Sequence, residues 1–213
     1  MKKLTLLICI CFATLAQAQN FRGGAFAGLS LSQIDGDTYS GYTKPGFIVG
    51  ASVSKALSED FALAMEFKFI QKGARASSFS DEFGGDDYKV SLNYIQIPLL
   101  AKYNVWNNIW MEAGIGFAYL IDYKEERNDN RLKDLPFRKS EFAILAGAAY
   151  DIPNTILRVG ARFSYSILPV RKIGDAVIYG FFDRSAQYNN NLEFTFGLRF
   201  DDIITRKKTK NRI

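Results

Sequence analysis

The chain has 213 residues, of which 48% are hydrophobic and 15% aromatic, and its formal net charge is +5. It contains no histidine, which excludes the Ser-His-Asp hydrolases and removes the commonest metal ligand. One domain is the usual outcome for a chain of this length, and all-β barrels of this size are single domains.

Residues 1–18 have the pattern of a secretory signal peptide. Two lysines precede an apolar run from Leu4 to Leu15, and small residues at Ala16 and Ala18 form an A-x-A cleavage site. The alternative is a membrane anchor, but the run is shorter than the roughly 20 residues that a spanning helix needs. We expect cleavage after Ala18.

Cleavage would change both the cysteine content and the charge of the chain. Cys9 and Cys11 would leave with the signal, so disulfides would not stabilise the exported protein, and thiol catalysis and zinc sites would be excluded. The basic tail 201–213 carries most of the remaining positive charge. The near-neutral body 19–200 therefore gives no reason to expect nucleic-acid binding.

Apolar and polar residues alternate with period two in eight segments of this body, which is the signature of β-strands. Most segments are close to the roughly 9 to 11 residues with which a tilted strand crosses a bilayer. The candidate strands are 23–33, 46–55, 61–72, 93–103, 109–121, 141–150, 156–167 and 191–200.

The connections between these segments alternate in length. The segments "ALSED", "VWNN" and "DIPNT" are short, whereas the other four connections are long and polar. Bacterial outer-membrane barrels have short periplasmic turns, long outer loops and an even number of strands. The sequence thus predicts an all-β, eight-stranded antiparallel up-and-down transmembrane β-barrel of a Gram-negative outer membrane, with both termini periplasmic.

One face of most strands is apolar, and the other carries small residues and charges. The sixth strand is rich in small residues, and its facing is ambiguous. A soluble lipocalin-type barrel has the same period with its faces exchanged, so a soluble periplasmic carrier is the alternative. Glycine beside bulky charges suits a narrow lumen, and aromatic residues near the strand ends resemble membrane-interface girdles. If the barrel spans a membrane, eight charged residues face its lumen and form a structural charge network: Glu66, Lys68, Lys102, Glu112, Arg158, Arg162, Glu193 and Arg199.

Two details of the strands carry separate predictions. Pro98 interrupts the fourth strand, where a missing N–H predicts a bulge or a locally broken ladder. The last strand resembles the terminal strand of an outer-membrane barrel, although a tail follows it. We expect Phe196, Leu198 and Phe200 to face lipid and to form an internal insertion signal that the barrel-assembly machinery reads.

Four segments, "GAFAGLSLSQIDGD", "EFKFIQKGAR", "YIQIPLLAKY" and "MEAGIGFAYLI", resemble successive strands of the PorT-like outer-membrane β-barrel family. The likeness covers nearly the whole mature chain, and Ile-Pro-Leu-Leu is its most specific part. The resemblance implies an eight-stranded barrel. It also allows an accessory role in outer-membrane assembly or type IX-like protein secretion, although no motif here carries that role.

The remaining chemistry favours a protein that is not an enzyme and needs no cofactor or metal. Eight-stranded interiors are just wide enough for side chains, so the inward charges would neutralise one another as a plug. The acidic loop "SDEFGGDDYK" could hold Ca²⁺, but its spacing is not that of an EF-hand, and a solvated loop is the simpler interpretation. Outer-membrane lipid and lipopolysaccharide are expected partners.

The predicted loops also carry aromatic residues, which favour contact with lipopolysaccharide or with a protein partner at the outer face. These residues are Tyr42, Phe79, Phe83, Tyr88, Tyr179, Phe181, Phe182 and Tyr188.

Overall fold

The computed structural model describes residues 21–36, 41–76, 87–128, 130–131, 136–172 and 186–200. The predicted signal peptide 1–18 and the basic tail 201–213 lie outside these described residues. No helix within the described ranges is both long and apolar enough to cross a membrane.

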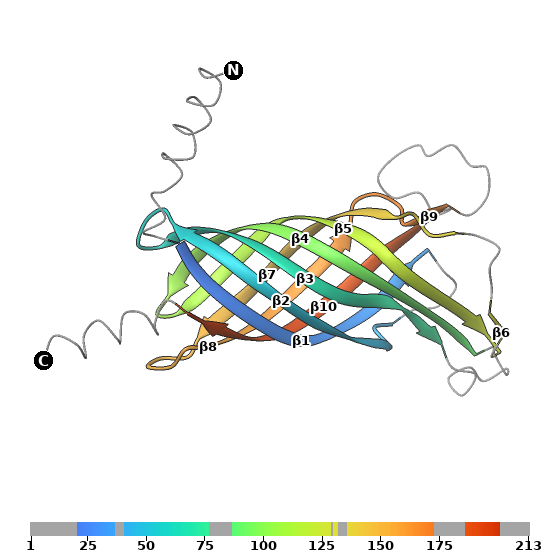
Figure 1. Ribbon diagram of the computed structural model, residues 1–213, viewed down its shortest axis with the longest axis horizontal. Helices are drawn as coiled ribbons and strands as arrows, with labels where there is room; N and C mark the ends of the chain where they lie inside the picture. The colour runs from blue at the N-terminus through green and yellow to red at the C-terminus, as the bar shows by residue number, and fades with distance from the viewer. Residues whose placement is uncertain are drawn as a thin grey trace, which may run out of the picture.

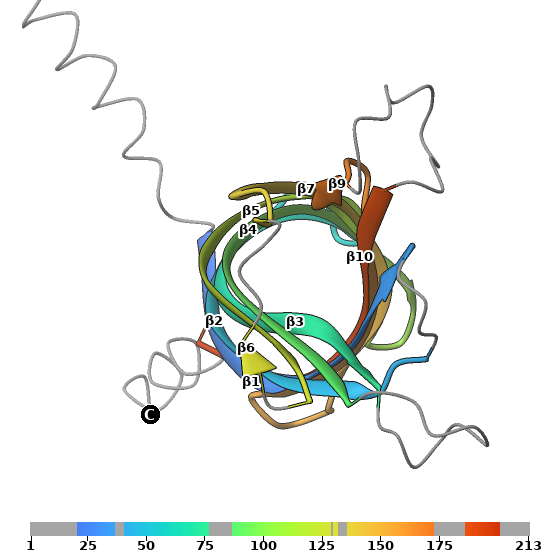
Figure 2. The same ribbon diagram turned by 90° about the vertical axis from the view of Figure 1, so that its right-hand side faces the viewer.

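Eight long antiparallel strands of the described chain form a closed ring (Figures 1 and 2). Each strand pairs with the next long strand in sequence, and β1 pairs with β10 to close the barrel, so the predicted up-and-down topology is confirmed. Two short strands were not predicted: β6 (Asn130–Arg131) pairs with β5, and β9 (Arg171–Lys172) pairs with β10. The long strands are β1 (Phe21–Asp35), β2 (Lys44–Ala56), β3 (Phe61–Ala76), β4 (Tyr88–Trp106), β5 (Ile109–Arg127), β7 (Ser140–Asp151), β8 (Leu157–Ser166) and β10 (Ala186–Arg199).

The two ends of the barrel differ in their connections. The short connections β2–β3, β4–β5 and β7–β8 lie at the same end as Phe21 and Phe200, and we call it the turn end. Asn107 and Asn108 form the β4–β5 turn with positive φ angles of 22° and 72°, as the twist of a two-residue hairpin requires. The longer connections lie at the opposite end, the loop end.

Several strands extend further toward the loop end than the sequence predicted. β4 and β5 contain 19 residues each, well beyond the length that a bilayer requires. Tyr88 and Tyr188 were predicted in loops, but they belong to β4 and β10 and are only 5% and 4% exposed. They are therefore not available as surface contacts. Tyr42 donates a hydrogen bond to Asn190, and the other predicted loop aromatics lie outside the described residues.

The outer wall is an apolar belt. Large hydrophobic side chains project from it, including Leu29 at 61%, Ile115 at 61% and Phe196 at 71% exposure. Such a surface suits lipid and would be costly in water. Aromatic residues lie near both edges of the belt: Phe61, Tyr103, Trp106, Tyr150 and Phe200 toward the turn end, and Phe47, Phe69, Tyr119 and Phe142 toward the loop end.

Pro98 breaks one ladder without a bulge. The β3–β4 pairing omits Ile97 and Pro98, yet its register is the same before and after them. On the opposite side, Pro98 lies in register with Gly116 of β5. The predicted alternative of a bulge is therefore wrong, and the break in the ladder fits a missing N–H on the side of β3.

The loop-end half of the interior contains a cluster of large apolar side chains beside its charged groups, which corrects the expectation that the inward face carries only small residues and charges. A buried cluster forms there and includes Phe137 and Val170 from the loop-end connections. Loop-end residues fold into the mouth of the barrel and pack on its inner wall. The other members are Ile34, Ile48, Ile70, Ala74, Tyr88, Val90, Leu92, Tyr94, Ala118 and Leu120.

Candidate functional site: the charged interior

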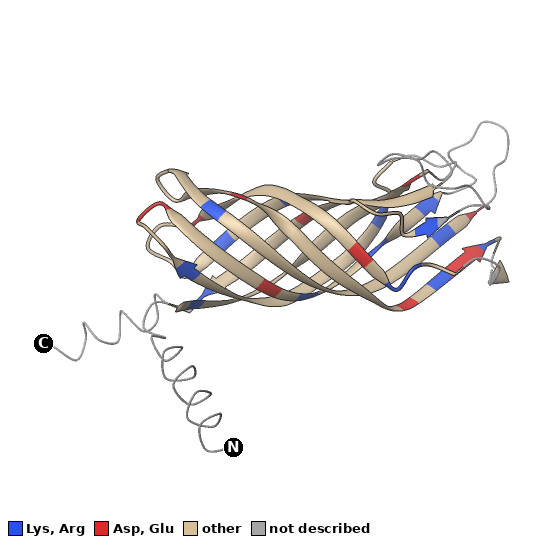
Figure 3. Ribbon diagram, turned by 90° about the horizontal axis from the view of Figure 1, so that it is seen from above, with Lys and Arg blue, Asp and Glu red and all other residues tan. Residues whose placement is uncertain are grey.

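Charged residues occur along the whole length of the strands (Figure 3). All eight residues of the predicted charge network lie on inward-facing positions, and each makes an ion pair. Period-two alternation places them there because every second side chain of a strand points into the barrel.

Arg162 of β8 is the centre of this network. Its guanidinium donates to both carboxylate oxygens of Glu66 on β3 at 2.9 and 3.0 Å, and its Nε donates to Glu112 on β5 at 2.8 Å. Its Nη1 lies 3.6 Å from Glu193 on β10. The planar guanidinium has five N–H donors in a fixed fork, so it can donate two bonds to one carboxylate and still reach others. One side chain therefore links four strands across the interior.

Two lysines neutralise the remaining charge of the same carboxylates. Lys102 Nζ lies 3.2 Å from Glu112 and 3.9 Å from Glu66, and Lys68 donates a hydrogen bond to Glu193. The side chains of Lys68 and Glu193 are 0% and 1% exposed. Charged side chains that are buried this completely are tolerated only when they are paired and hydrogen-bonded.

Glycine makes space for these long side chains. A methyl group added to Gly147 would lie 2.7 Å from the Cα atom and 3.0 Å from the Cβ atom of Arg162. One added to Gly50 would lie 2.7 Å from Cβ of Lys68. These contacts are closer than packed carbon atoms allow, so the glycines are required where the charged side chains leave the wall.

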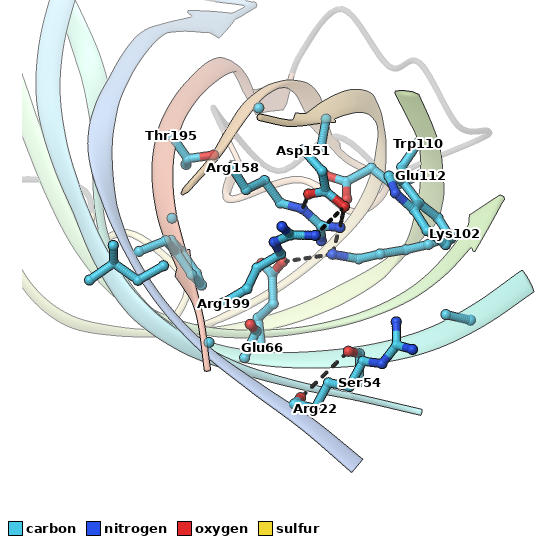
Figure 4. Close-up of a pocket in the computed structure, with 18 of the residues that line it drawn as sticks. Arg22, Ser54, Glu66, Lys102, Trp110, Glu112, Asp151, Arg158, Thr195 and Arg199 are labelled. Carbon is cyan, nitrogen blue, oxygen red and sulfur yellow. Dashed lines mark hydrogen bonds and ion pairs between the residues drawn. The ribbon is translucent and has the colours of Figure 1, made fainter. Parts of the chain in front are cut away.

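A second group of charges lies at the turn end. Arg158 donates two hydrogen bonds to Asp151, and Arg199 Nη1 lies 3.0 Å from the same carboxylate (Figure 4). Arg199 also donates to the carbonyl of Thr155 at 2.9 Å. A cavity of about 90 Å³ lies between this group and the pairs of Glu66 and Glu112.

A third group of charges, which the sequence pattern did not predict, lies toward the loop end. Lys72 Nζ lies 2.6 Å from Glu141, whose other oxygen accepts a hydrogen bond of 2.6 Å from Asn189. The ring of Tyr94 lies below Lys72, with 5.4 Å from Nζ to its centre. The alternation of inward and outward residues could have indicated that Glu141 faces the interior. The small residues of the predicted strand 141–150, however, left its facing ambiguous. Lys72 is the last residue of the predicted strand 61–72, and Asp151 belongs to the predicted turn "DIPNT".

At the mouth of the loop end, Arg171 donates to both oxygens of Glu125 at 2.9 and 2.7 Å, and Tyr88 donates to Glu125 at 2.7 Å. The neighbouring outward side chains Lys124 and Glu126 are charged, so this site lies outside the apolar belt. Burial raises the pKa of Glu125, but the hydrogen bonds from Arg171 and Tyr88 outweigh it and hold that pKa below its ordinary value.

Within the described residues, no group of three or more His, Cys, Asp or Glu side chains is arranged to hold a metal ion. Of the acidic loop discussed above, Asp81, Glu82 and Asp86 lie outside the described part of the chain. The buried carboxylates in the interior each accept hydrogen bonds or form ion pairs with cations, an arrangement typical of a structural network.

The residues predicted as the insertion signal face outward. Phe196, Leu198 and Phe200 are 71%, 42% and 40% exposed, and the N–H of Phe200 donates to the carbonyl of Gly23 at 2.9 Å. The last strand is thus held to the first one up to Phe200, at the turn-end edge of the belt.

Comparison with solved structures shows the same fold. The attachment invasion locus protein Ail of Yersinia pestis matches with a TM-score of 0.51 and 14% identity, over 85% of this chain and 99% of Ail. Neisserial surface protein A matches with a TM-score of 0.44 and 12% identity, over 84% of this chain and 96% of that one. The outer membrane protein OprG of Pseudomonas aeruginosa matches with a TM-score of 0.41 and 12% identity, over 84% of this chain and 94% of OprG.

A search of curated protein sequences gave no match. The family described as "Outer membrane protein beta-barrel domain" matches residues 16–171, which is more than half of the chain. The closed ring, the apolar outer wall and this match agree, and the chain belongs to the outer membrane protein beta-barrel domain family.

Proposed function

We propose that this protein is a non-enzymatic barrel of the Gram-negative outer membrane whose lumen is closed and which acts through its loop-end surface, by binding a partner or by stabilising the envelope. The observation that carries the proposal is the set of contacts of Arg162, which joins carboxylates of three other strands across the interior. A side chain that spans the lumen at mid-depth leaves little room for solute.

Two further features support a closed lumen. The apolar cluster around Phe137 and Val170 and the buried Lys72–Glu141 pair occupy the loop-end half, and the cavity near Asp151 holds only about 90 Å³. Eight-stranded barrels have interiors that side chains can fill, whereas open porins use more strands.

Planar-bilayer recording tests this part of the proposal. We expect the purified mature chain to give no stepwise conductance, while an open porin recorded in the same bilayers conducts. Arg162→Ala is the matched variant, because it removes the bridging side chain from the same barrel. Stable conductance steps from the unchanged protein would contradict the closed lumen.

We place the loop end outside the cell and both termini in the periplasm, because outer-membrane barrels have short periplasmic turns. The test uses single cysteines in a background where Cys9 and Cys11 are replaced by serine. A membrane-impermeant maleimide applied to intact cells should label Lys139→Cys, at the loop end, and should label Glu59→Cys, at the turn end, only after the outer membrane is opened. The reverse pattern would contradict this orientation.

Outer-membrane lipid, lipopolysaccharide, the barrel-assembly machinery and a protein partner at the outer loops remain the proposed partners. The absence of histidine from the sequence and the pairing of the buried carboxylates support a role without catalysis. Nucleic acid is not among the proposed partners, because the barrel segment is close to neutral.

A secretion or assembly accessory is the second candidate, and the resemblance of "YIQIPLLAKY" to the PorT-like family favours it. This segment forms the middle of β4, with Pro98 facing the interior. A deletion strain assayed for exported proteins separates the candidates. Loss of secretion, restored by the intact gene, would support the accessory role, and normal secretion would count against it.

A further inference from the structure

Neutral polar side chains from three strands meet inside the barrel, between the buried Lys72–Glu141 and Lys68–Glu193 pairs. We call these side chains the polar layer: Gln96 of β4, Ser164 of β8, and Asn189 and Asn191 of β10. All four occupy inward-facing positions and are at most 1% exposed. They are therefore cut off from bulk solvent.

The polar layer contains five polar atoms that have no hydrogen-bond partner among the described residues. Both amide atoms of Gln96 belong to this set, and so do the side-chain oxygens of Ser164, Asn189 and Asn191. A buried polar group that makes no hydrogen bond lowers stability, and such groups are rare in folded proteins. Five of them in one region indicate that something other than the described chain provides their partners.

The two asparagines direct their oxygen atoms into the layer. Asn189 Nδ2 donates to Glu141 at 2.6 Å, and Asn191 Nδ2 donates to Glu193 at 3.3 Å. A carboxylate only accepts hydrogen bonds, so the nitrogen of each amide must face its glutamate. Ser164 lies in register with Asn191 on the neighbouring strand. Three acceptor oxygens therefore lie along this part of the inner wall.

Gln96 approaches the same region from β4. It lies in register with Lys68, and Lys68 donates to Glu193, the carboxylate that Asn191 also contacts. One chain of direct neighbours thus leads from Gln96 to Asn191, through the Lys68–Glu193 pair. The unpartnered amide of Gln96 and the unpartnered oxygen of Asn191 are on the two sides of that pair.

The packing around Gln96 limits the size of any occupant. A methyl group added to Gly116 would lie 2.9 Å from Gln96 Nε2 and 3.0 Å from Cδ1 of Leu145. Leu145 in turn lies in register with Ser164. The amide of Gln96 is therefore close to a packed leucine, and only a small molecule can bind beside it.

The chemistry of the polar layer indicates which small molecule fits. The asparagine oxygens accept hydrogen bonds, whereas the amide nitrogen of Gln96 donates them, so the occupant must both donate and accept. The adjacent carboxylates are already paired with Lys68 and Lys72, and a bound ion would be a buried charge without a counter-ion. Water is small and neutral, and a buried water makes about three hydrogen bonds.

We propose that the polar layer is a binding site for enclosed water molecules, which accept from Gln96 and donate to Asn189, Asn191 and Ser164. Bound water would join the Lys72–Glu141 pair and the Lys68–Glu193 pair into one hydrogen-bonded network through the interior. This site requires neither a partner at the loop-end surface nor a particular orientation of the barrel.

Ser164→Ala tests whether the hydroxyl is hydrated. With water bound, the variant loses a hydrogen bond, and its urea midpoint in lipid vesicles should fall. Without water, removal of a buried unpartnered hydroxyl should raise the midpoint, and a rise would overturn the proposal. Ser52→Ala is the matched control, because Ser52 lines the turn-end cavity and is only partly buried. Its midpoint should not change, and an equal fall in both variants would also contradict the proposal.

Water in the polar layer can be detected by NMR in the folded mature chain. In nanodiscs of deuterated lipid, the side-chain amide of Gln96 should show a cross-peak with water. Asn191→Leu should abolish this cross-peak, because leucine fills the site and removes an acceptor. Asn190→Leu, the same change on the outward face of the same strand, should leave it unchanged. Absence of the cross-peak in the unchanged chain would overturn the proposal.

A crystal structure that shows ordered water distinguishes the remaining occupants. We expect a water molecule within hydrogen-bond distance of Asn191 Oδ1 and Ser164 Oγ. A direct hydrogen bond from Gln96 Nε2 to one of these oxygens, with no water between them, would contradict the proposal. A sodium or potassium ion bound by the oxygens of the layer would contradict it as well.

Discussion

Lys68 and Glu193 are 125 residues apart in sequence and form a buried ion pair across the strands of the barrel, with both side chains at most 1% exposed. Lys68 projects from β3 and Glu193 from β10, so the contact exists only because β1 and β10 close the ring. The pair shows how the interior of this barrel depends on closure.

This pair predicts strong non-additivity. Lys68→Met or Glu193→Leu alone should lower the free energy of unfolding by about 3–5 kcal/mol, because each leaves a buried charge without its main partner. The double variant should be much closer to the unchanged protein. Urea unfolding of the unchanged chain, the two single variants and the double variant in lipid vesicles gives the double-mutant cycle. If the two single losses of unfolding free energy add up in the double variant, the two charges do not interact.

Arg162→Ala should be among the most damaging substitutions in the interior. It removes the hydrogen bonds to Glu66 and Glu112 and leaves buried carboxylates close together, a loss of about 3–5 kcal/mol in unfolding free energy. Lys124→Ala is the control, because it breaks an exposed ion pair that contributes only about 0–1 kcal/mol. Similar losses in both variants would contradict a central role for Arg162.

The insertion signal can be separated from the tail. Removing residues 201–213 should leave the barrel inserted, because Phe200 still pairs with Gly23 and closes the last strand. Phe200→Asp should impair assembly, since it places a charge on the lipid-facing edge of the belt. Heat-modifiable migration of outer-membrane fractions reports both. Loss of folding on truncation with normal folding of Phe200→Asp would show that the signal lies in the tail.

The mouth of the barrel should loosen in acid. The pKa of Glu125 in the folded chain is lower than its ordinary value, so its contribution is complete at neutral pH and is lost as the pH falls below the ordinary range of about 4. The protection factor of the Val170 amide, which donates to Gln187, should fall there once exchange is compared with the intrinsic rate at each pH.

Glu125→Gln is the control for this acid effect. The variant should show the lower protection factor of Val170 already at neutral pH, and that protection factor should no longer fall with acid. An unchanged acid dependence in Glu125→Gln would assign the effect to another group.

The sequence by itself determined the strands, their order and the facing of most side chains. Period-two alternation fixes which side chains share a face, and the alternating connection lengths place the turns at one end, as at Asn107 and Asn108. It therefore placed Arg162 and Glu66 inside the barrel without any knowledge of their contact. These properties are local, since a strand and its turn depend on neighbouring residues.

Only the tertiary structure decided which charges meet and where the interior becomes apolar. Arg162 and Glu66 are 96 residues apart, and their contact depends on the register and tilt of strands across the ring. The burial of Tyr88 has the same origin, because β4 extends further than alternation predicted. Closure of the sheet brings distant residues together, and a linear pattern carries no information on that distance.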